Sequence, residues 1–146
     1  MQNVFYAGGH YIKTEAGEAL SVQETTGHLV LTNGTRVQVK RAWVDALTNA
    51  TTELIPANAT CVFRVLSMFM LGGATAPSVT FKSASTTISP VFANAANGGA
   101  VLPPNLWGWF QTTAMNEALN VTVSSSSNVG VIVNYIEITD DLTDLL

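Results

Sequence analysis

Charged side chains are scarce in this chain of 146 residues, which has 6 Lys and Arg and 10 Asp and Glu. They make up 11% of the residues, against about 25% in an average soluble domain. The one close cluster of cations is Arg36, Lys40 and Arg41. A nucleic-acid-binding protein uses many clustered cations to displace counterions from phosphates, so we expect no nucleic-acid partner.

Cysteine and histidine are equally rare. The single Cys61 excludes an intrachain disulfide and a zinc site built from several cysteines, and its apolar neighbours predict a buried thiol. The two histidines, His10 and His28, stand in no metal-binding or nucleophile–base motif. Paired carboxylates at 15–18 and 140–141 fall in a predicted turn and a predicted tail. We therefore expect no catalytic residue, no metal and no cofactor, and we do not expect this protein to be an enzyme.

Membrane-directed features are missing as well. The most apolar stretch, Cys61 to Leu71, contains Arg64 and is too short to span a bilayer. We find no basic amphipathic helix that would bind a membrane surface. The first residues carry neither a basic region nor a long apolar run, so they do not resemble a secretory signal. We expect a protein made in a cytoplasm, with no membrane partner.

Neutral polar residues supply the missing polarity, since Thr, Ser and Asn together account for 39 residues. Hydrophobic residues make up 47%, which at this length is enough for one domain with a substantial core. Val, Thr, Ile and aromatic residues recur in short runs separated by Gly, Asn, Ser and Pro, as in strands. The spacing predicts an all-β fold with at most short helices, either a sandwich or a barrel.

The clearest local unit is a β-hairpin, in which Asn33-Gly34 joins the strands His28–Thr32 and Thr35–Val39. A long strand is predicted at Cys61–Met70, buried on both faces or covered on one face by a neighbouring subunit. Ser78–Lys82 alternates like a half-exposed strand. Further strands are predicted at Ser89–Phe92 and at a final pair, Asn120–Ser124 and Val129–Ile138. Residues 41–53 are predicted as a short helix or a loop, and residues 93–100 as a loop.

Two tryptophans and a phenylalanine lie within four residues, directly after a stiff Pro103-Pro104 segment. In an extended chain Trp107 and Trp109 would point to one side and Phe110 to the other. Three interpretations stay open at this stage. The indoles could pack in the core, form an oligomer or partner interface, or stack against a sugar.

The C-terminal third of the chain contains a combination of short motifs. They are Leu102-Pro103-Pro104-Asn105, Gly108-Trp109-Phe110, Glu117-Ala118-Leu119-Asn120-Val121, the polar turn Ser124–Ser127, and the Val-rich strand Gly130–Tyr135. This pattern resembles small β-sandwich proteins on the virions of tailed bacteriophages, of the capsid decoration (cement) type.

The resemblance implies an antiparallel, jelly-roll-like β-sandwich that forms a homo-oligomer, and we expect that oligomer to be a trimer. It implies a structural virion protein on the capsid surface, made in the host cytoplasm, whose partner is the major capsid protein and whose binding stabilises the shell. The alternative is a tail or fibre component with a carbohydrate-binding role. Candidate interface residues are Leu102, Trp107, Trp109 and Phe110.

The domain organisation is predicted as a single sandwich domain at residues 1–138, with residues 1–13 as an N-terminal arm and 139–146 as a short tail. A helical tail would place Leu142, Leu145 and Leu146 on one face. Those leucines complete the candidate interface, because they would dock onto a neighbouring subunit or the capsid. The other interpretation of this segment is a frayed tail, since eight residues do not hold a helix alone in water.

Overall fold

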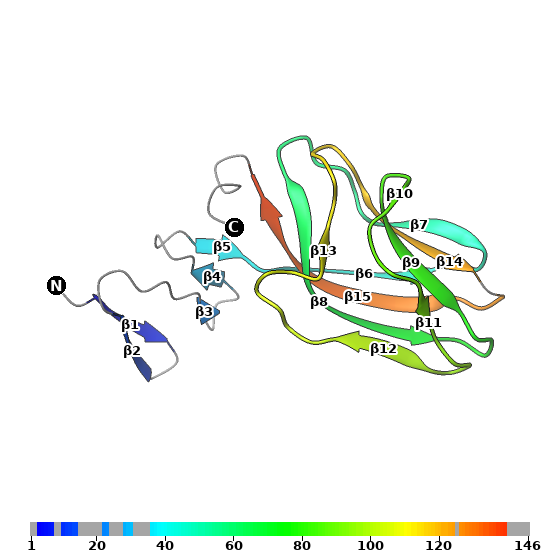
Figure 1. Cartoon of the computed structure of the whole chain (residues 1–146), viewed down its shortest axis with the longest axis horizontal. Helices are drawn as coiled ribbons and strands as arrows, with labels where there is room; N and C mark the ends of the chain where they lie inside the picture. Colours follow the sequence, from blue (N-terminus) through cyan, green and yellow to red (C-terminus); the bar gives the residue numbers. More distant parts are fainter. Residues whose placement is uncertain are drawn as a thin grey trace. The chain divides into compact units, whose positions relative to one another are not determined.

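The computed structural model describes residues 37–124 and 126–139 in full, and the backbone alone of residue 36 and of the strands at 3–7, 10–14, 22–23 and 28–30. The chain divides into two units, residues 1–40 and a larger unit that begins at Arg41. The larger unit is the β-sandwich (Figure 1).

The first unit contains two small antiparallel sheets. Strand β1 (Asn3–Ala7) pairs with β2 (His10–Thr14). The second sheet has the order β3 (Val22–Gln23), β4 (His28–Val30), β5 (Arg36–Gln38).

The pairing of β4 with β5 confirms the predicted hairpin, but its register differs from the prediction. Leu29 lies opposite Val37, whereas a two-residue Asn33-Gly34 turn would place Gln38 there. The register of the two strands is therefore shifted by one residue from the predicted one. The observed register sets two apolar residues opposite each other, and such cross-strand pairs stabilise a sheet. The connecting residues 31–35 lie outside the described part of the chain.

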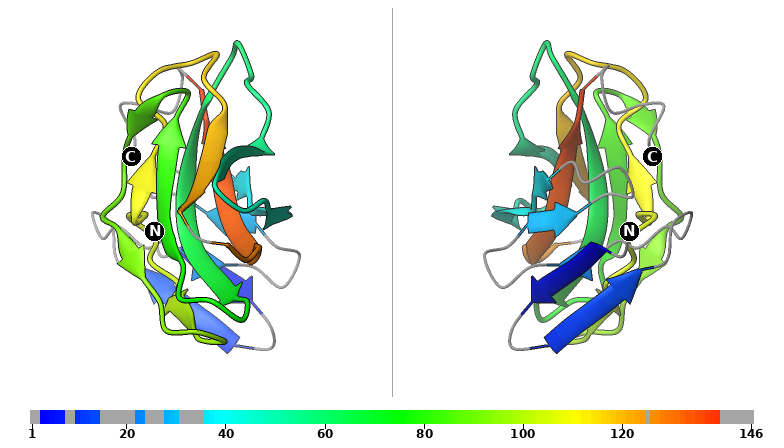
Figure 2. Two further views of the ribbon diagram at one scale, coloured as in Figure 1. Left: turned by 90° about the vertical axis from the view of Figure 1, so that its right-hand side faces the viewer. Right: turned by 90° about the vertical axis from the view of Figure 1, so that its left-hand side faces the viewer.

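Two antiparallel sheets form the sandwich, and their layers can be followed in Figures 1 and 2. The first, named here the β8 sheet, has the order β6 (Lys40–Ala46), β15 (Val129–Ile138), β8 (Val62–Gly72), β12 (Gly99–Leu102), with β13 (Phe110–Gln111) also paired to β8. The second, the β9 sheet, has the order β7 (Ala50–Ile55), β14 (Leu119–Ser124), β9 (Ser78–Ser83), with β10 (Thr86–Thr87) and β11 (Phe92–Ala93) both paired to β9.

The order of these strands is that of a jelly roll. In the β8 sheet the first strand of the sandwich, β6, lies beside the last, β15. In the β9 sheet the second strand, β7, lies beside the second to last, β14. Successive strands from β6 to β9 alternate between the two sheets, as they do in the double-sheet arrangement of jelly rolls. The predicted antiparallel, jelly-roll-like sandwich is confirmed.

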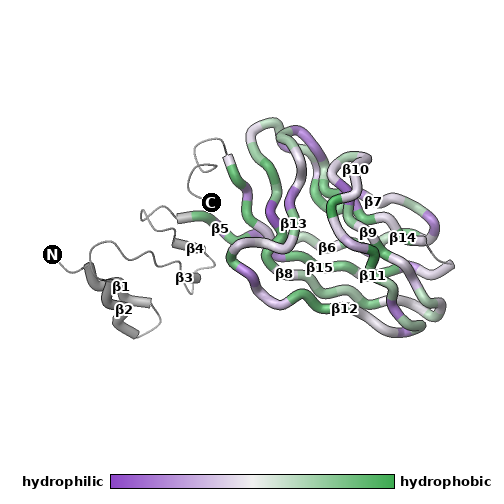
Figure 3. Tube along the Cα trace, in the orientation of Figure 1, coloured by the Kyte–Doolittle hydropathy of each residue, from purple (hydrophilic) through white to green (hydrophobic). Residues whose placement is uncertain are grey.

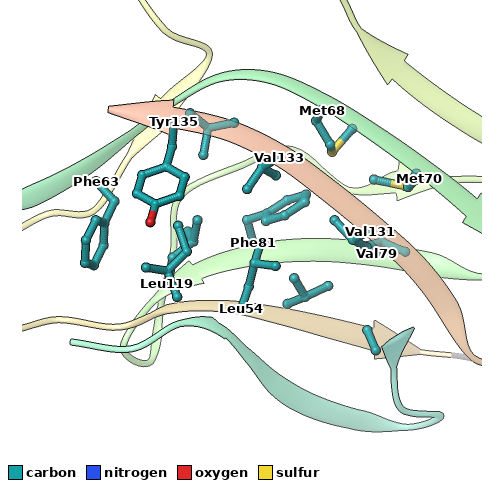
Figure 4. Close-up of a cluster of buried hydrophobic side chains, with 14 of the residues drawn as sticks. Leu54, Phe63, Met68, Met70, Val79, Phe81, Leu119, Val131, Val133 and Tyr135 are labelled. Carbon is teal, nitrogen blue, oxygen red and sulfur yellow. The ribbon is translucent and has the colours of Figure 1, made fainter. Parts of the chain in front are cut away.

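The core lies between the sheets because each strand buries every second residue. Buried and half-buried residues alternate along β9 and β14. Figure 4 shows side chains of both sheets pointing toward one another, with Phe81 near the centre. The ring of Phe81 lies 4.7 Å from that of Phe110, and the rings of Phe63 and Tyr135 are 5.8 Å apart in an edge-to-face arrangement. Cys61 is buried, as predicted.

Residues 41–53 form strands, so the predicted helix or loop is wrong there. They make most of β6 and β7, joined by a turn near Asn49. Ala42, Val44 and Ala46 pack toward the core while Arg41 and the residues two and four positions on are exposed. Ala and Asp have low intrinsic strand preference, and packing against the core overrides it.

The final two strands exist as predicted but are not a pair. β14 pairs with β7 and β9, and β15 pairs with β8 in the other sheet. The connection between them therefore crosses the sandwich. Each strand directs one apolar face at the same core from opposite sides, which a hairpin within one sheet would not allow.

Candidate interaction surface

Asn105 organises the segment from Pro103 to Trp109, named here the Trp loop. Its backbone N–H donates to the Leu66 carbonyl oxygen at 2.9 Å. Its side-chain Oδ1 accepts the backbone N–H of Trp107 at 3.1 Å, and its Nδ2 donates to the carbonyl oxygen of Gly108 at 3.2 Å. Side-chain bonds of this kind hold an Asn in a tight turn. The loop is thus fixed to β8 and internally hydrogen-bonded.

The turn makes the expectation of an extended segment wrong, because residues 106 and 107 form a turn. Trp107 is 80% exposed and Trp109 is 44% exposed, so the interpretation of both indoles as core residues is also wrong. The indole Nε1 of Trp109 donates to the Pro103 carbonyl oxygen at 2.7 Å, which holds this ring along the loop. Trp107 is presented to solvent by a rigid segment.

Gly108 is required at its position for two reasons. Its φ of +80° lies in the left-handed region that favours glycine. An added Cβ would also lie 2.4 Å from Cγ of Arg64, whose side chain passes beneath the loop. The Arg64 Nε donates to Gln111 Oε1 at 2.9 Å. Burial lowers the pKa of the Arg64 guanidinium, which nevertheless stays charged.

The other candidate residues divide between the core and the part of the chain that is not described. Leu102 and Phe110, at the two ends of the Trp loop, are half-buried and pack against the core. Leu142, Leu145 and Leu146 lie outside the described residues. Of the predicted interface residues, the structure therefore places Trp107 and Trp109 on the surface.

A second exposed apolar surface lies on the outer face of the β8 sheet, where Phe69 is exposed. The prediction that the strand at Cys61–Met70 is buried on both faces is therefore wrong, and its alternative, that a neighbouring subunit covers one face, stays a prediction. Sequence reasoning missed the exposed apolar residues of the other strands of this sheet.

The central feature of this surface is a line of side chains across the four strands, named here the apolar row: Trp43 on β6, Ile132 on β15, Phe69 on β8 and Val101 on β12. Phe69 is directly paired with both Ile132 and Val101. Trp43 is 73% exposed and Phe69 48%. Leu71, two residues beyond Phe69, adds to the surface. Figure 3 shows hydrophobic stretches along β8, β12 and β15.

Polar side chains fix the position of Trp43 at one end of the row. Arg41 Nε donates to Asn134 Oδ1 at 3.3 Å, and Asn128 Nδ2 donates to Asp45 Oδ2 at 3.2 Å. Trp43 lies midway between Arg41 and Asp45 on β6, so these two contacts place it at the level of the row. A cation and an anion thus stand one on each side of the row, each hydrogen-bonded to a neutral amide.

The Glu117 carboxylate closes the loop that leads into β14. Its Oε2 accepts hydrogen bonds from the hydroxyl of buried Ser83, from Thr113 Oγ1 at 2.6 Å and from the backbone N–H of Ala114 at 3.2 Å. The hydrogen bond from Ser83, followed by that from Thr113, lowers the pKa of Glu117. These bonds stabilise the charged form and hold one of the sequence motifs, Glu-Ala-Leu, in place.

The remaining chemistry-bearing residues offer no assembled centre in the described chain. His10 and His28 lie in β2 and β4, and the carboxylates at 15–18 and 140–141 fall outside the description. Among the described residues no group of three His, Cys, Asp or Glu is placed to hold a metal ion. Nor does any helix there have the length and apolar character needed to cross a membrane.

Comparison with known proteins adds no relative: a scan against protein-family models and a search of curated proteins both found no match. The apolar row and the Trp loop are accordingly interpreted from their geometry. The row could have been found in the sequence by asking which residues of each strand point away from the core. Trp43, Phe69 and Ile132 are apolar at positions where a solvated sheet face carries polar side chains.

Proposed function

We propose that this chain is a structural protein of a virion, which decorates the outer capsid surface as a homo-oligomer and stabilises the shell. The observation that carries the proposal is a jelly-roll sandwich with a rigid apolar surface on one sheet and an ordered, exposed tryptophan loop. Jelly rolls recur in viral capsid proteins, and exposed apolar patches of this kind mark interaction sites. The resemblance of the C-terminal motifs to phage decoration proteins points the same way.

The composition suits such a role. Neutral Thr, Ser and Asn side chains solvate the surface with little net charge, so many copies can pack side by side without strong repulsion. Aromatic side chains supply large contact areas at low entropic cost in interface cores. The proposed role is structural and not enzymatic, and it uses no cofactor.

A tail or fibre component that binds carbohydrate is the second candidate, and the Trp loop is the observation that favours it. Lectin domains also use jelly rolls, and Trp107 offers an open ring face for a sugar. Gln111 and Asn105 are the nearby amides. Both Asn105 amide atoms already bond within the loop, which leaves fewer groups to recognise sugar hydroxyls and favours the capsid role.

The experiment is immunogold electron microscopy of virus particles purified from the host strain that carries this gene. Label distributed over the head supports the decoration role. Label confined to the tail or fibres supports the second candidate, and particles without label exclude a virion protein. A glycan array with the wild-type chain and the Trp107→Ala variant then tests sugar binding, which the decoration role predicts to be absent in both.

A further inference from the structure

We propose that the outer face of the β8 sheet is the contact between two copies of this chain, related by a two-fold axis that runs along the apolar row. The inference rests on the homo-oligomer of the proposed function, and it puts a two-fold dimer in place of the trimer that the resemblance implies. In this arrangement two β8 sheets stack face to face, as sheets do about 10 Å apart in sandwiches. Each residue of the row then meets its own counterpart.

The size of the surface fits an interface between copies. With roughly 200 Å² for a fully exposed aromatic side chain, the apolar row and Leu71 together expose about 500 Å² of apolar surface. A standard protein interface covers about 800 Å² on each partner, of which roughly 60% is apolar. The two apolar areas agree. The polar residues on each side of the row would supply the hydrated rim.

The charges at the end of the row are complementary under this symmetry. Arg41 and Asp45 lie two positions before and two positions after Trp43 on the same face of β6. A two-fold axis along the row reverses the strand direction, so Arg41 of one copy lies over Asp45 of the other, and the pair occurs twice. An interface of this kind is isologous, with one patch used by both partners. Another partner would need to carry the two charges in reversed order independently, whereas a second copy does so by symmetry.

The shape of β15 is complementary in the same way. Asn134 lies two residues after Ile132, and Gly130 lies two residues before it, so the axis places Asn134 of one copy over Gly130 of the other. The space above Gly130 is open, because an added Cβ would meet no atom closer than the Leu71 carbonyl oxygen at 3.9 Å. The missing side chain of Gly130 thus leaves room for the amide of Asn134.

Gly130 also offers a substitution that blocks the face without disturbing the sandwich. Gly130→Lys projects a long charged side chain from the centre of the surface into open space. Thr86→Lys, on an exposed strand of the β9 sheet, adds the same charge elsewhere and is the matched control. The measurement is sedimentation equilibrium of the full-length chain, with circular dichroism to confirm the fold of each variant.

We expect the wild type and Thr86→Lys to sediment at twice the chain mass of 15.5 kDa, and Gly130→Lys at the mass of one chain. A wild type that sediments as a monomer or as a trimer overturns the proposal. So does a folded Gly130→Lys variant that dimerises like the wild type.

A charge exchange tests the symmetry independently of Gly130. Arg41→Asp places two carboxylates together on each side of the row at its Trp43 end, and Asp45→Arg does the same with two cations. Each single variant should weaken dimerisation about tenfold or more. The double variant R41D/D45R restores the opposite charges and should return the dissociation constant to within about threefold of the wild type. A double variant as weak as the singles together contradicts the two-fold arrangement.

Failure of this inference is distinguishable from failure of the proposed function. A chain that forms trimers and still labels capsids removes the two-fold contact and leaves the decoration role in place. A chain that dimerises through this face but is absent from particles supports the two-fold contact and removes the decoration role.

Discussion

Two residues of the structure show how single positions fix the surface loops. Glu117 accepts three hydrogen bonds at the entrance to β14, and Gly108 gives the Trp loop a backbone conformation that strains other residues. Both residues stand in the C-terminal motifs, but their roles depend on partners far away in the sequence, Ser83 and Arg64. The motifs can be recognised in the sequence, but the hydrogen-bond partner of Glu117 and the neighbour of Gly108 are known only from the fold.

Glu117 makes stability depend on pH. Its pKa is lowered in the folded chain from an ordinary value of 4.5, so its contribution is fully present above that value and is lost as the pH falls through the folded pKa. The variant Glu117→Gln should be less stable than the wild type at neutral pH. The difference in melting temperature should shrink as the pH is lowered toward 3. An equal difference at every pH would contradict the assigned hydrogen bonds to the carboxylate.

The glycines of the two surfaces should respond in opposite ways to substitution by alanine. Gly108→Ala meets the Arg64 side chain and a strained φ, so it should lower the free energy of unfolding by about 1–3 kcal/mol. Within a single chain Gly130→Ala enters open space on a regular strand, so at concentrations too low for dimerisation it should be neutral or stabilise the chain by up to about 1 kcal/mol. Urea unfolding of both variants measures this. A tolerated Gly108→Ala would show that the Trp loop is not held as described.

At the scale of elements, the strands with alternating residues and the long apolar strand β8 were predictable, whereas β6 and β7 were not. Ser78–Lys82 and Asn120–Ser124 alternate between apolar and polar residues, and both are strands. β6 has Arg, Ala and Asp in its interior, and this composition led to the prediction of a helix or loop there. Sheet membership was not predictable either, because a connection across the sandwich and a hairpin within one sheet can have the same length and composition.

The element-scale prediction concerns Phe81, which is fully buried on β9 and contacts the rings of Phe92 and Phe110. Phe81→Ala should lower the free energy of unfolding by about 3–5 kcal/mol, since it removes a large side chain from between the sheets. The control Val91→Ala changes an exposed apolar residue and should stay within about 0.5 kcal/mol. A small loss at Phe81 would contradict its central place in the core.

For the whole molecule, the all-β class follows from composition and run length, and the structure adds the jelly-roll order and the division of the chain near Lys40. The candidate surface was half predictable. The Trp loop is recognisable in the sequence because its aromatic residues are clustered. The apolar row is not, because its residues are spread over four strands that are distant in sequence. A row of this kind appears only when the registers of β15, β8 and β12 are known.

The proposed decoration role places this jelly roll on the outside of a viral head. The most direct measurement is a pair of cryo-electron microscopy maps, of particles made with the gene intact and of particles made with the gene deleted. A decoration protein gives extra density of jelly-roll size, repeated over the outer shell, in the first map alone. Identical shells in the two maps, or a difference confined to the tail, would contradict it.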